Sequence, residues 1–300
     1  MSTIGFIGTG TIGCPMAMRI LEQQHGLSVF DTNAHALLPL IERGATKETD
    51  VAAIAASCST VFLSLPGPAQ IESVVLGAGG LLENLQPQST IVDLSTNSVS
   101  LNRKVSELTA AKEIHYLDAP VSGGKRAAIK GTLAVMIGGD ETAFNRARPF
   151  IECFGDKLFY MGPSGSGTLT KLVNNQIFLS ASVLIQEGFV MGVKAGMDPS
   201  ALLEVIKASS AGPLMANAPL VLSQKFDLDV FSLAIAAKDV GVALESADDL
   251  GAAMPMTKAA HGVYRDALEA GLGNEDFFAT SKVLAASAGV EMPALRKPPK

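Results

Sequence analysis

The first half of the chain alternates short apolar runs with longer segments in which apolar residues recur at helical spacing. Continuous apolar runs bounded by turn residues are typical of strands buried in a parallel sheet, and the longer pattern is typical of amphipathic helices. The runs predict strands at Thr3–Gly8, Leu27–Phe30, Thr60–Leu65, Thr90–Leu94, Glu113–Asp118, Leu133–Ile137 and Lys157–Met161. Helices are predicted at Asp50–Ala56 and Glu141–Glu152. This order predicts an α/β fold with a Rossmann-type, doubly wound sheet.

The pattern changes after Pro163, where the β/α alternation stops and only helical periodicity continues. The predicted helices are Leu169–Val193, Pro199–Ala208, a segment around Pro213–Gln224, Ser232–Ala247, Pro255–Ala270 and Glu275–Ala288. We therefore expect two domains, a nucleotide-binding domain at 1–163 and an all-helical substrate and oligomerisation domain at 164–300. The first of these helices is apolar around most of its circumference, which predicts burial on several sides.

The helical half carries more apolar residues than a thin layer of helices can bury alone. Val183, Leu184, Val190 and Met191 are examples. A symmetric association through this half would cover them, so we expect a homodimer or a homotetramer.

Composition restricts the function classes. The chain has 300 residues, of which 48% are hydrophobic and 17% charged, and its net charge of −6 argues against nucleic acid as a partner. The three cysteines, Cys14, Cys58 and Cys153, are widely spaced, so they predict neither a disulfide framework nor a metal site and fit a reducing cytosol. A strand at Thr3 leaves no room for a signal peptide, and polar residues interrupt the long helix, which argues against a membrane span. We expect a cytoplasmic protein with a small-molecule partner.

A glycine-rich loop, Gly8-Thr9-Gly10-Thr11-Ile12-Gly13, follows the first strand and opens a helix. The first glycine allows a tight turn, the second lets a pyrophosphate approach the backbone, and the third lets helix and strand pack closely. The helix N-terminus then faces the anion. A glycine-rich turn without a ligand is the alternative, and the strand–loop–helix context favours dinucleotide binding.

Asp31 ends the second strand, 18 positions after Gly13. A carboxylate there can accept hydrogen bonds from the ribose hydroxyls and repels a 2′-phosphate. Thr32 and Asn33 follow, with no arginine, so the sequence favours NAD while NADP remains an alternative. Asp31 could instead cap the next helix.

Loops at the carboxyl ends of parallel strands line the ligand crevice of such sheets. Leu65, Pro66 and Thr96 lie in two of these loops and are candidate cofactor contacts, although plain turn residues are an equal alternative. A third loop contains Ser122-Gly123-Gly124, whose backbone N–H groups suit a carboxylate. Taken alone, this third loop also fits a surface turn.

Lys171 and Asn175 lie four residues apart near the start of the long helix, so they share one face. Lys171 could extend its ammonium to solvent, or it could be a general acid/base beside an asparagine that holds a substrate oxygen. Lys238 stands with Asp239 amid apolar residues of a later helix. That pair fits a solvated helix face, or a second lysine that reaches the cofactor or the substrate.

Four motifs occur in order along nearly the whole chain: Phe6–Ala17, Asp118–Gly124 with Gly131-Thr132-Leu133, Gly165–Asn175, and Lys238-Asp239. Together they resemble the β-hydroxyacid dehydrogenase family. The resemblance implies a Rossmann domain plus a helical domain with the active site between them. It implies Lys171 as the catalytic acid/base, Asn175 as a substrate ligand, Ser122, Gly123 and Gly124 around the substrate carboxylate, and Thr96 and Lys238 at the cofactor.

The implied reaction is hydride transfer between NAD, or NADP, and a short 3-hydroxy acid or its semialdehyde, of the 3-hydroxyisobutyrate, tartronate semialdehyde or glyoxylate type. No metal is implied. The rival interpretation is a non-catalytic dinucleotide-sensing or scaffold protein that retains the fold, although the joint presence of Lys171, Asn175 and the Ser122 turn disfavours it. Lys125 and Arg126 make the turn after Gly124 unusually basic. They are either surface charges or contacts for a second anionic group or polyhydroxyl tail of the substrate.

Overall fold

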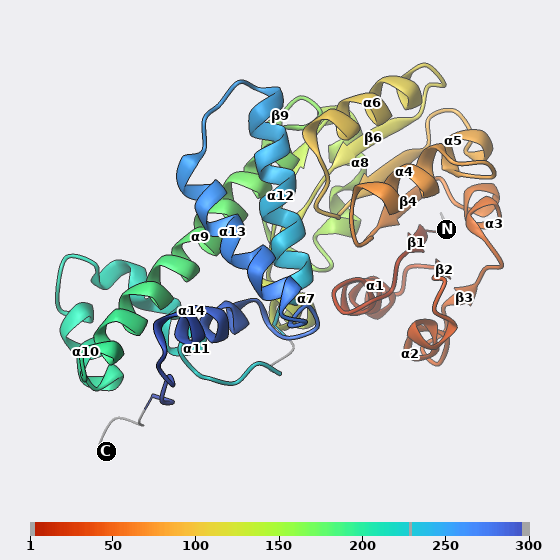
Figure 1. Ribbon diagram of the computed structural model, residues 1–300. Helices are drawn as coiled ribbons and strands as arrows, with labels where there is room; N and C mark the ends of the chain where they lie inside the picture. The colour runs from red at the N-terminus through yellow and green to blue at the C-terminus, as the bar shows by residue number, and fades with distance from the viewer. Residues whose placement is uncertain (1–3, 228–229, 296–300) are drawn as a thin grey trace. The chain divides into compact units, whose positions relative to one another are not determined.

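The computed structural model describes residues 4–227 and 230–295, so Thr3, the first residue of the first predicted strand, lies outside the described residues. The chain forms two compact units, Met1–Leu172 and Val173–Lys300 (Figure 1). The division between a nucleotide domain at 1–163 and a helical domain at 164–300 stays a functional prediction.

The first unit is built on a nine-stranded sheet in the order β3-β2-β1-β4-β5-β6-β8-β7, with β9 paired to β8. The strands are β1 Ile4–Ile7, β2 Leu27–Phe30, β3 Thr46–Lys47, β4 Thr60–Leu63, β5 Thr90–Asp93, β6 His115–Asp118, β7 Val121–Ser122, β8 Leu133–Gly138 and β9 Gly155–Gly162. All pairs from β3 to β6 are parallel, whereas β8 runs antiparallel to β6 and β7 and parallel to β9. The α/β prediction is therefore confirmed, with an antiparallel addition at one side of the sheet.

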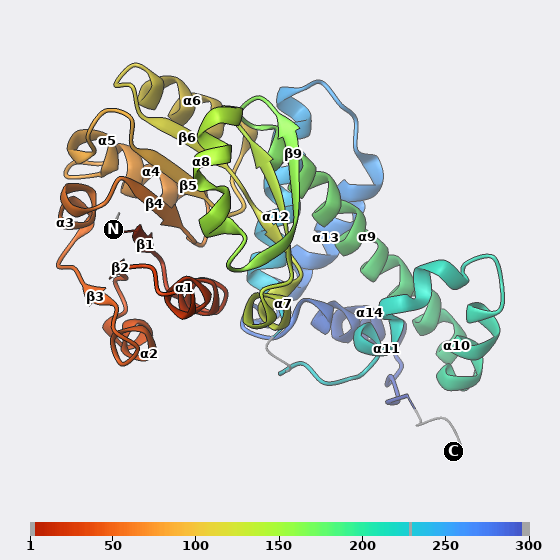
Figure 2. The same cartoon turned by 180° about the vertical axis from the view of Figure 1, so that it is seen from behind.

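Helices cover both faces of this sheet, and successive strand residues point to opposite faces. Phe6 and Phe62 belong to the core on one face, and their strand neighbours Ile7 and Leu63 belong to the core on the other. Figure 1 shows α4 and α6 over one face, and Figure 2 shows α1 and α8 over the other. The helical segments of this unit are α1 Gly13–Glu22, η1 Ala34–Leu37, α2 Leu38–Ile41, α3 Val51–Ser57, α4 Pro68–Leu76, α5 Leu81–Asn84, α6 Val99–Ala110, α7 Gly124–Lys130 and α8 Glu141–Ile151.

Several predicted element bounds differ from the observed ones by a few residues, and two of the differences have a local cause. β6 begins at His115, whereas the sequence pattern predicted Glu113, because Glu113 has a φ of 56°, outside the strand region. Helix α3 begins after Asp50, whose carboxylate accepts a hydrogen bond from the Ala53 N–H at 2.8 Å and so caps the helix.

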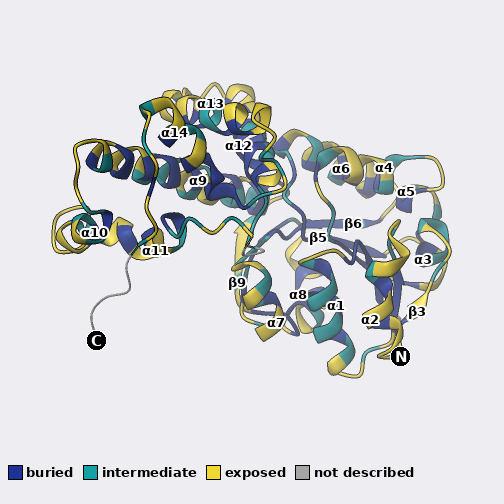
Figure 3. Cartoon of the chain, turned by 60° about the horizontal axis from the view of Figure 1, so that its bottom comes forward, coloured by how far each residue is buried: buried dark blue, intermediate teal, exposed yellow. Residues whose placement is uncertain are grey.

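The second unit consists of helices around two apolar clusters, one of which contains Tyr264, Phe277 and Phe278. The helical segments are α10 Pro199–Lys207, η2 Gly212–Asn217, α11 Ala218–Val221, α12 Leu233–Asp249, α13 Pro255–Glu269, η3 Phe277–Ala279 and α14 Thr280–Ala288, together with most of α9 Ser166–Lys194. Figure 3 shows their buried faces in dark blue. The helix predicted from Glu275 begins instead at Phe277, as a 3₁₀ segment, because Asp276 has an extended backbone and pairs with Ser232 in an isolated β-bridge.

Helix α9 is the longest helix among the described residues, at 29 residues. The prediction of burial on several sides is only partly right. Val183 and Val190 are 3% and 6% exposed, whereas Leu184 and Met191 are 57% and 73% exposed. By length and composition alone, α9 is the one described helix that could cross a membrane, and a mostly buried core helix passes the same test.

Candidate active site

The glycine-rich loop has the geometry of a dinucleotide cradle. Gly8 has a φ of 90°, and a Cβ on it would lie 2.2 Å from the Ser64 carbonyl oxygen, so only glycine fits this turn. A Cβ on Gly13 would lie 2.0 Å from the Gly8 carbonyl oxygen, which explains the close approach of α1 to β1. At Gly10, no described heavy atom lies within 4 Å of the position a Cβ would take. The backbone there is open to a ligand, at the N-terminus of a helix that no described side chain caps.

Asp31 is bonded to this loop. Its Oδ2 accepts the Thr9 N–H at 2.7 Å, and its Oδ1 accepts the Asn33 N–H at 2.8 Å. Asn33, rather than Asp31, caps the following 3₁₀ helix by accepting the His35 N–H. The carboxylate is half-buried, so it orders the loop and still presents a partly exposed negative charge beside it.

The loops after β1, β4, β5 and β6 meet at one edge of the sheet. In the parallel register Ile7 pairs with Leu63, Leu63 with Asp93, and Asp93 with Asp118. The segments that begin at Gly8, Ser64, Leu94 and Ala119 therefore leave the sheet side by side. All of the predicted cofactor contacts of the first unit except Asp31 lie in the first three of these segments.

The individual contact candidates differ in burial. Leu65 is half-buried and Pro66 is exposed. Thr96 is half-buried and stands between Ser95 and Asn97, which are 5% and 0% exposed. Thr96 is therefore fixed on both sides while its own side chain remains partly accessible.

Ser122 ends the short strand β7, and Gly123 and Gly124 make the turn into α7. Their φ angles of 129° and 67° lie in a region that favours glycine, and both residues are exposed. The turn predicted from the sequence is therefore present with its backbone accessible. Lys125 is half-buried and Arg126 is exposed.

Lys171 and Asn175 lie one turn apart on α9, as the spacing predicts. The start of this helix is held by Asp118 at the end of β6. Its Oδ1 accepts the Gly165 N–H at 2.8 Å, and its Oδ2 accepts the Thr168 N–H at 2.7 Å. Burial raises the pKa of Asp118 to about 6, although these two N–H groups act in the opposite direction.

Asn175 is 6% exposed and is oriented by another buried carboxylate. Its Nδ2 donates to Asp239 Oδ2 at 2.7 Å, and its Oδ1 accepts from Asn174 Nδ2 at 3.1 Å. Lys238 Nζ lies 2.7 Å from Asp239 Oδ1. Since this oxygen has no hydrogen-bond partner of regular geometry among the described residues, the contact is an ion pair. Asp239, at 1% exposure, thus links two predicted site residues.

The sequence did not reveal the roles of Asp118 and Asp239. Both residues belong to motifs named in the sequence analysis, but a motif does not show which hydrogen-bond donors a carboxylate contacts in the folded protein. The partners are 47, 50 and 64 residues away. One sequence signal could have pointed to Asp118: it is an acidic residue at the end of a strand predicted to be buried, without a nearby cation in the sequence.

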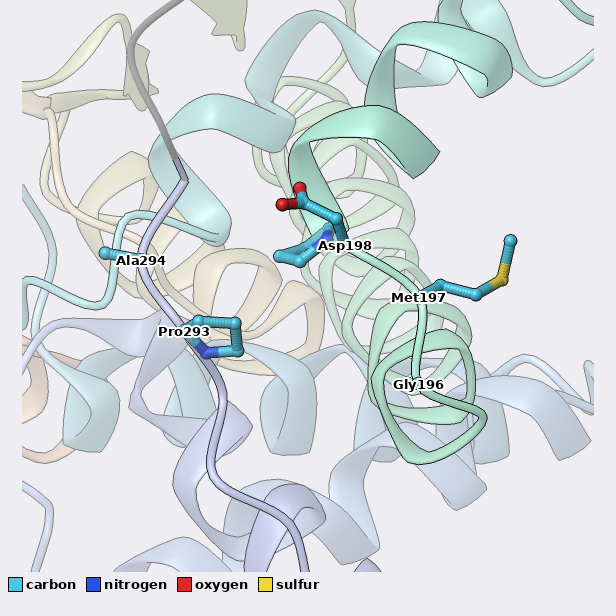
Figure 4. Close-up of a pocket in the computed structure, with 6 residues that line it drawn as sticks. Gly196, Met197, Asp198, Pro293 and Ala294 are labelled. Atoms are coloured by element: carbon cyan, nitrogen blue, oxygen red, sulfur yellow. The ribbon is translucent and has the colours of Figure 1, made fainter.

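A pocket lined by Gly196, Met197, Asp198, Pro199, Pro293 and Ala294 lies in the second unit (Figure 4). None of these six residues belongs to the four motifs. Across residues 4–227 and 230–295, no three His, Cys, Asp or Glu side chains are grouped as a metal site would require. The motif residues, rather than this pocket, therefore define the candidate active site.

Comparison with known proteins gives concordant matches over nearly the whole chain. Residues 3–162 match the NAD binding domain of 6-phosphogluconate dehydrogenase, and residues 165–284 match a model described as NAD-binding of NADP-dependent 3-hydroxyisobutyrate dehydrogenase. The chain is 33% identical to 2-(hydroxymethyl)glutarate dehydrogenase of Eubacterium barkeri, with 96% of this chain and 97% of that protein covered. It is 35% identical to 3-hydroxyisobutyrate dehydrogenase of Pseudomonas aeruginosa, with coverage of 88% and 91%.

A solved structure of Mycobacterium tuberculosis 3-hydroxyisobutyrate dehydrogenase with L-serine superposes with a TM-score of 0.83 at 29% identity, and covers 95% of this chain and 99% of that one. The sequence relatives and this structure span both units, and the two family models adjoin where the β/α pattern ends. The chain belongs to the β-hydroxyacid dehydrogenase family.

Proposed function

We propose that this protein catalyses reversible hydride transfer between a nicotinamide dinucleotide and a short 3-hydroxy carboxylic acid, with the semialdehyde as the oxidised partner. The support is that one chain contains both an open glycine-rich loop and a helix that carries Lys171 and Asn175. The relatives named above act on hydroxy acids of this kind, according to their names.

The cofactor fits the residues of the sheet edge. The open backbone at Gly10 and the N-terminus of α1 would hold the pyrophosphate, and Leu65, Pro66 and Thr96 lie in the adjacent loops. We propose NAD as the preferred form, because the partly exposed Asp31 carboxylate would repel a 2′-phosphate. The nicotinamide supplies a hydride acceptor or donor when it is bound.

The chain's own residues supply binding and proton transfer. We propose that the exposed Gly123 and Gly124 N–H groups, with Ser122, bind the substrate carboxylate. In oxidation the C–H bond breaks with its electron pair, which leaves as hydride, and the hydroxyl proton passes to Nζ of Lys171 in its amine form. In reduction Lys171 returns that proton to the carbonyl oxygen. Asn175 holds the same oxygen, with its amide fixed by Asp239.

The observation that carries this proposal is that one chain contains Lys171 and Asn175 one turn apart on α9, an accessible Gly123–Gly124 turn and an open glycine-rich loop. We expect purified protein to reduce NAD with at least one member of a panel containing 3-hydroxyisobutyrate, L-serine, glycerate and 2-(hydroxymethyl)glutarate, followed at the absorbance of the reduced cofactor. NADH binding without turnover on any member would favour the rival interpretation, a dinucleotide-sensing or scaffold protein.

We also propose a homodimer or homotetramer that associates through the 164–300 region. An apolar stripe on α9 supports it: Ile177, Leu184 and Met191 are spaced by seven residues and are 58%, 57% and 73% exposed. Light scattering should give a dimer or larger mass at micromolar concentration, and Leu184→Lys with Met191→Lys should lower it. Leu250→Lys, at another 51% exposed leucine, is the control. A monomeric wild type would contradict the proposal.

A cytoplasmic location is a further proposal. It is supported by three free cysteines, of which Cys58 and Cys153 are buried and Cys14 is half-buried. Fractionation of cells that express the protein, with a cytoplasmic and a membrane marker, tests it, and recovery with the membrane marker would contradict it.

A further inference from the structure

A buried polar network runs along the carboxyl edge of the sheet in the first unit. Its members are 0–5% exposed, and they are Asp93, Ser95, Asn102, Tyr116, Asp118 and Thr168. Polar groups buried this deeply are costly unless they are hydrogen-bonded, and a network that satisfies them holds its members in one arrangement. The partners in this network connect the cofactor loops to the first turn of α9.

The network begins at the loops after β4 and β5. Ser95 Oγ accepts the Leu65 N–H at 2.8 Å, and the Ser95 N–H donates to Asp93 Oδ1 at 3.0 Å. Asp93 Oδ2 accepts the Tyr116 hydroxyl at 2.7 Å. The backbone positions of two predicted cofactor contacts, Leu65 and Thr96, therefore depend on Ser95 and on the carboxylate behind it.

Asn102, on α6, is the junction of the network. Its Oδ1 accepts from Asn97 Nδ2 at 2.6 Å and lies 2.9 Å from the Tyr116 hydroxyl. Its Nδ2 donates to the Thr168 hydroxyl on α9. A single amide thus contacts the loop after β5, strand β6 and the first turn of α9, with no accessible surface of its own.

Asp118 forms the other end. The Gly165 and Thr168 N–H groups, which it accepts, are two of the four donors that the start of an α-helix leaves without an intrahelical partner. Helices usually satisfy these donors with a local Ser, Thr, Asp or Asn side chain. Here a carboxylate from the end of β6 does so, which attaches α9 to the sheet rather than to its own preceding loop. Lys171 follows Thr168 by three residues, on the same side of the helix.

We infer that this network, which ends in Asp118, positions Lys171 for proton transfer by fixing the first turn of α9 relative to the loops after β4 and β5. The inference rests on the proposed function. Asp118, Asn102 and Thr168 are positioning residues, because they act through the helix that carries Lys171. A displacement of about 1 Å of a reacting group can lower a rate roughly 100-fold, so a network that removes this freedom has a large effect on turnover.

The test separates positioning from simple helix capping. Asp118→Asn keeps the size but turns an NH₂ group toward a backbone donor, and Thr168→Val keeps the shape but removes the hydroxyl that Asn102 needs. Thr168→Ser is the conservative partner that retains the hydroxyl. Asp140→Asn is the matched control, because Asp140 caps α8 in the same unit by accepting the Ala143 N–H at 2.7 Å.

Each variant is assayed with NAD and the best substrate of the panel, protiated or deuterated at the carbon that bears the hydroxyl, and folded sites are counted by NADH fluorescence titration. For Asp118→Asn and Thr168→Val we expect kcat per folded site to fall roughly 10–100-fold and the primary isotope effect on kcat to increase, because the chemical step becomes slower. Thr168→Ser and Asp140→Asn should keep both values near wild type.

Unchanged kcat per folded site and an unchanged isotope effect in Thr168→Val, with a loss of melting temperature only, would overturn the inference even if Asp118→Asn failed to fold. Absence of turnover by the wild type on the whole panel is a different result, since it contradicts the proposed function. In that case amide exchange still tests the network. Faster exchange at Thr168 and Leu169 in Asp118→Asn than in Asp140→Asn is expected, and equal exchange would contradict it.

Discussion

Two buried aspartates serve helix α9, one in each unit, and they do so differently. Asp118 and Asp239 are each 1% exposed. Asp118 accepts two backbone N–H groups at the start of the helix, whereas Asp239 accepts one side-chain amide and pairs with the Lys238 ammonium. A carboxylate that accepts backbone N–H groups fixes the position of the whole helical turn. A carboxylate that accepts a side-chain amide fixes the orientation of that amide only.

The difference predicts different kinetic consequences. Loss of the Asp118 contacts would displace the start of α9 and with it Lys171, whose proposed proton transfer takes place in the transition state. Loss of the Asp239 contacts reorients Asn175, which in the proposed mechanism holds the substrate oxygen in both the ground state and the transition state. We therefore expect Asp118 variants to act mainly on kcat and Asp239 variants to act on KM as well.

The largest expected effect is at Lys171. Lys171→Ala should lower kcat roughly 10²- to 10⁴-fold, the usual contribution of general acid–base catalysis. NADH affinity should change little, because the proposed nucleotide site is the Gly8–Gly13 loop. Steady-state kinetics and fluorescence titration measure the two quantities. Lys194→Ala, at an exposed lysine at the end of the same helix, is the control. Near-normal turnover of Lys171→Ala would remove the reason for comparing the two aspartates and would make Lys238 the next candidate.

The next effect concerns cofactor choice and a third carboxylate. Asp31, like Asp118, accepts backbone N–H groups, from Thr9 and Asn33, but it is half-buried and still available to a ligand. We expect NAD to be preferred over NADP by about 1–3 kcal/mol, which is roughly 5- to 150-fold in kcat/KM. The preference should shrink in Asp31→Asn. A wild type that prefers NADP would contradict the assignment of Asp31.

A smaller effect sharpens the comparison itself. Asp239→Asn retains an acceptor for Asn175 but removes the charge beside Lys238. We therefore expect KM for the hydroxy acid to rise roughly 5- to 10-fold, which corresponds to the difference of about 1 kcal/mol between a charge-assisted and a neutral hydrogen bond. Asn175→Ala should raise KM and lower kcat together. Asp249→Asn, at an exposed position at the end of α12, is the control. If Asp239→Asn lowered kcat alone, the proposed division between the two aspartates would be wrong.

The smallest effect is the pH dependence that Asp118 introduces. Its folded-state pKa of about 6 lies above the ordinary value of 3.8, so the folded protein binds this proton more tightly than the unfolded chain does. The contribution of Asp118 to stability therefore increases as the pH falls through 6, and it is lost as the pH rises through 6. Protonation at the same time makes the carboxyl oxygen that carries the proton a weaker acceptor for an N–H.

We accordingly expect kcat to decline several-fold between pH 7 and pH 5 while the melting temperature shows no loss attributable to this group. Burial also raises the pKa of the neighbouring Asp93, which contacts the same network through the Tyr116 hydroxyl. The control must therefore distinguish Asp118 from Asp93. In Asp118→Asn the part of the decline that Asp118 causes should disappear, because the variant already lacks the second acceptor, whereas the part caused by protonation of the Lys171 amine should remain. A decline of equal size in the variant would assign it to another group.

Local chemistry explains what could be predicted before the structure. Apolar periodicity identified most of the strands and the long helix, since the repeat of apolar residues that marks a strand or a helix is set by positions a few residues apart in the sequence. Glycine spacing identified the Gly8–Gly13 loop, since backbone conformation at a turn is a local property. The four-residue spacing of Lys171 and Asn175 placed them on one helix face before any fold was known.

Several features were beyond such reasoning. The pattern gives no bounds for α6, whose residues are largely polar, and it therefore could not identify Asn102 as buried. It also did not show that β8 runs antiparallel to β6, or that the exposed apolar stripe of α9 includes Leu184 and Met191 but not Val183 and Val190. These features depend on which elements pack together.

The sequence by itself thus determined most of the strands, the long helix, the glycine-rich loop and the pair Lys171 and Asn175. Only the tertiary structure decided that Asp118 holds the start of α9, and that Asp239 holds Asn175. The physical reason is that a helix or a turn is specified by residues a few positions apart, whereas the partner of a buried carboxylate is specified by chain closure over 47 to 64 residues. In this protein the proposed catalytic residues belong to the first class, and the residues that position them belong to the second.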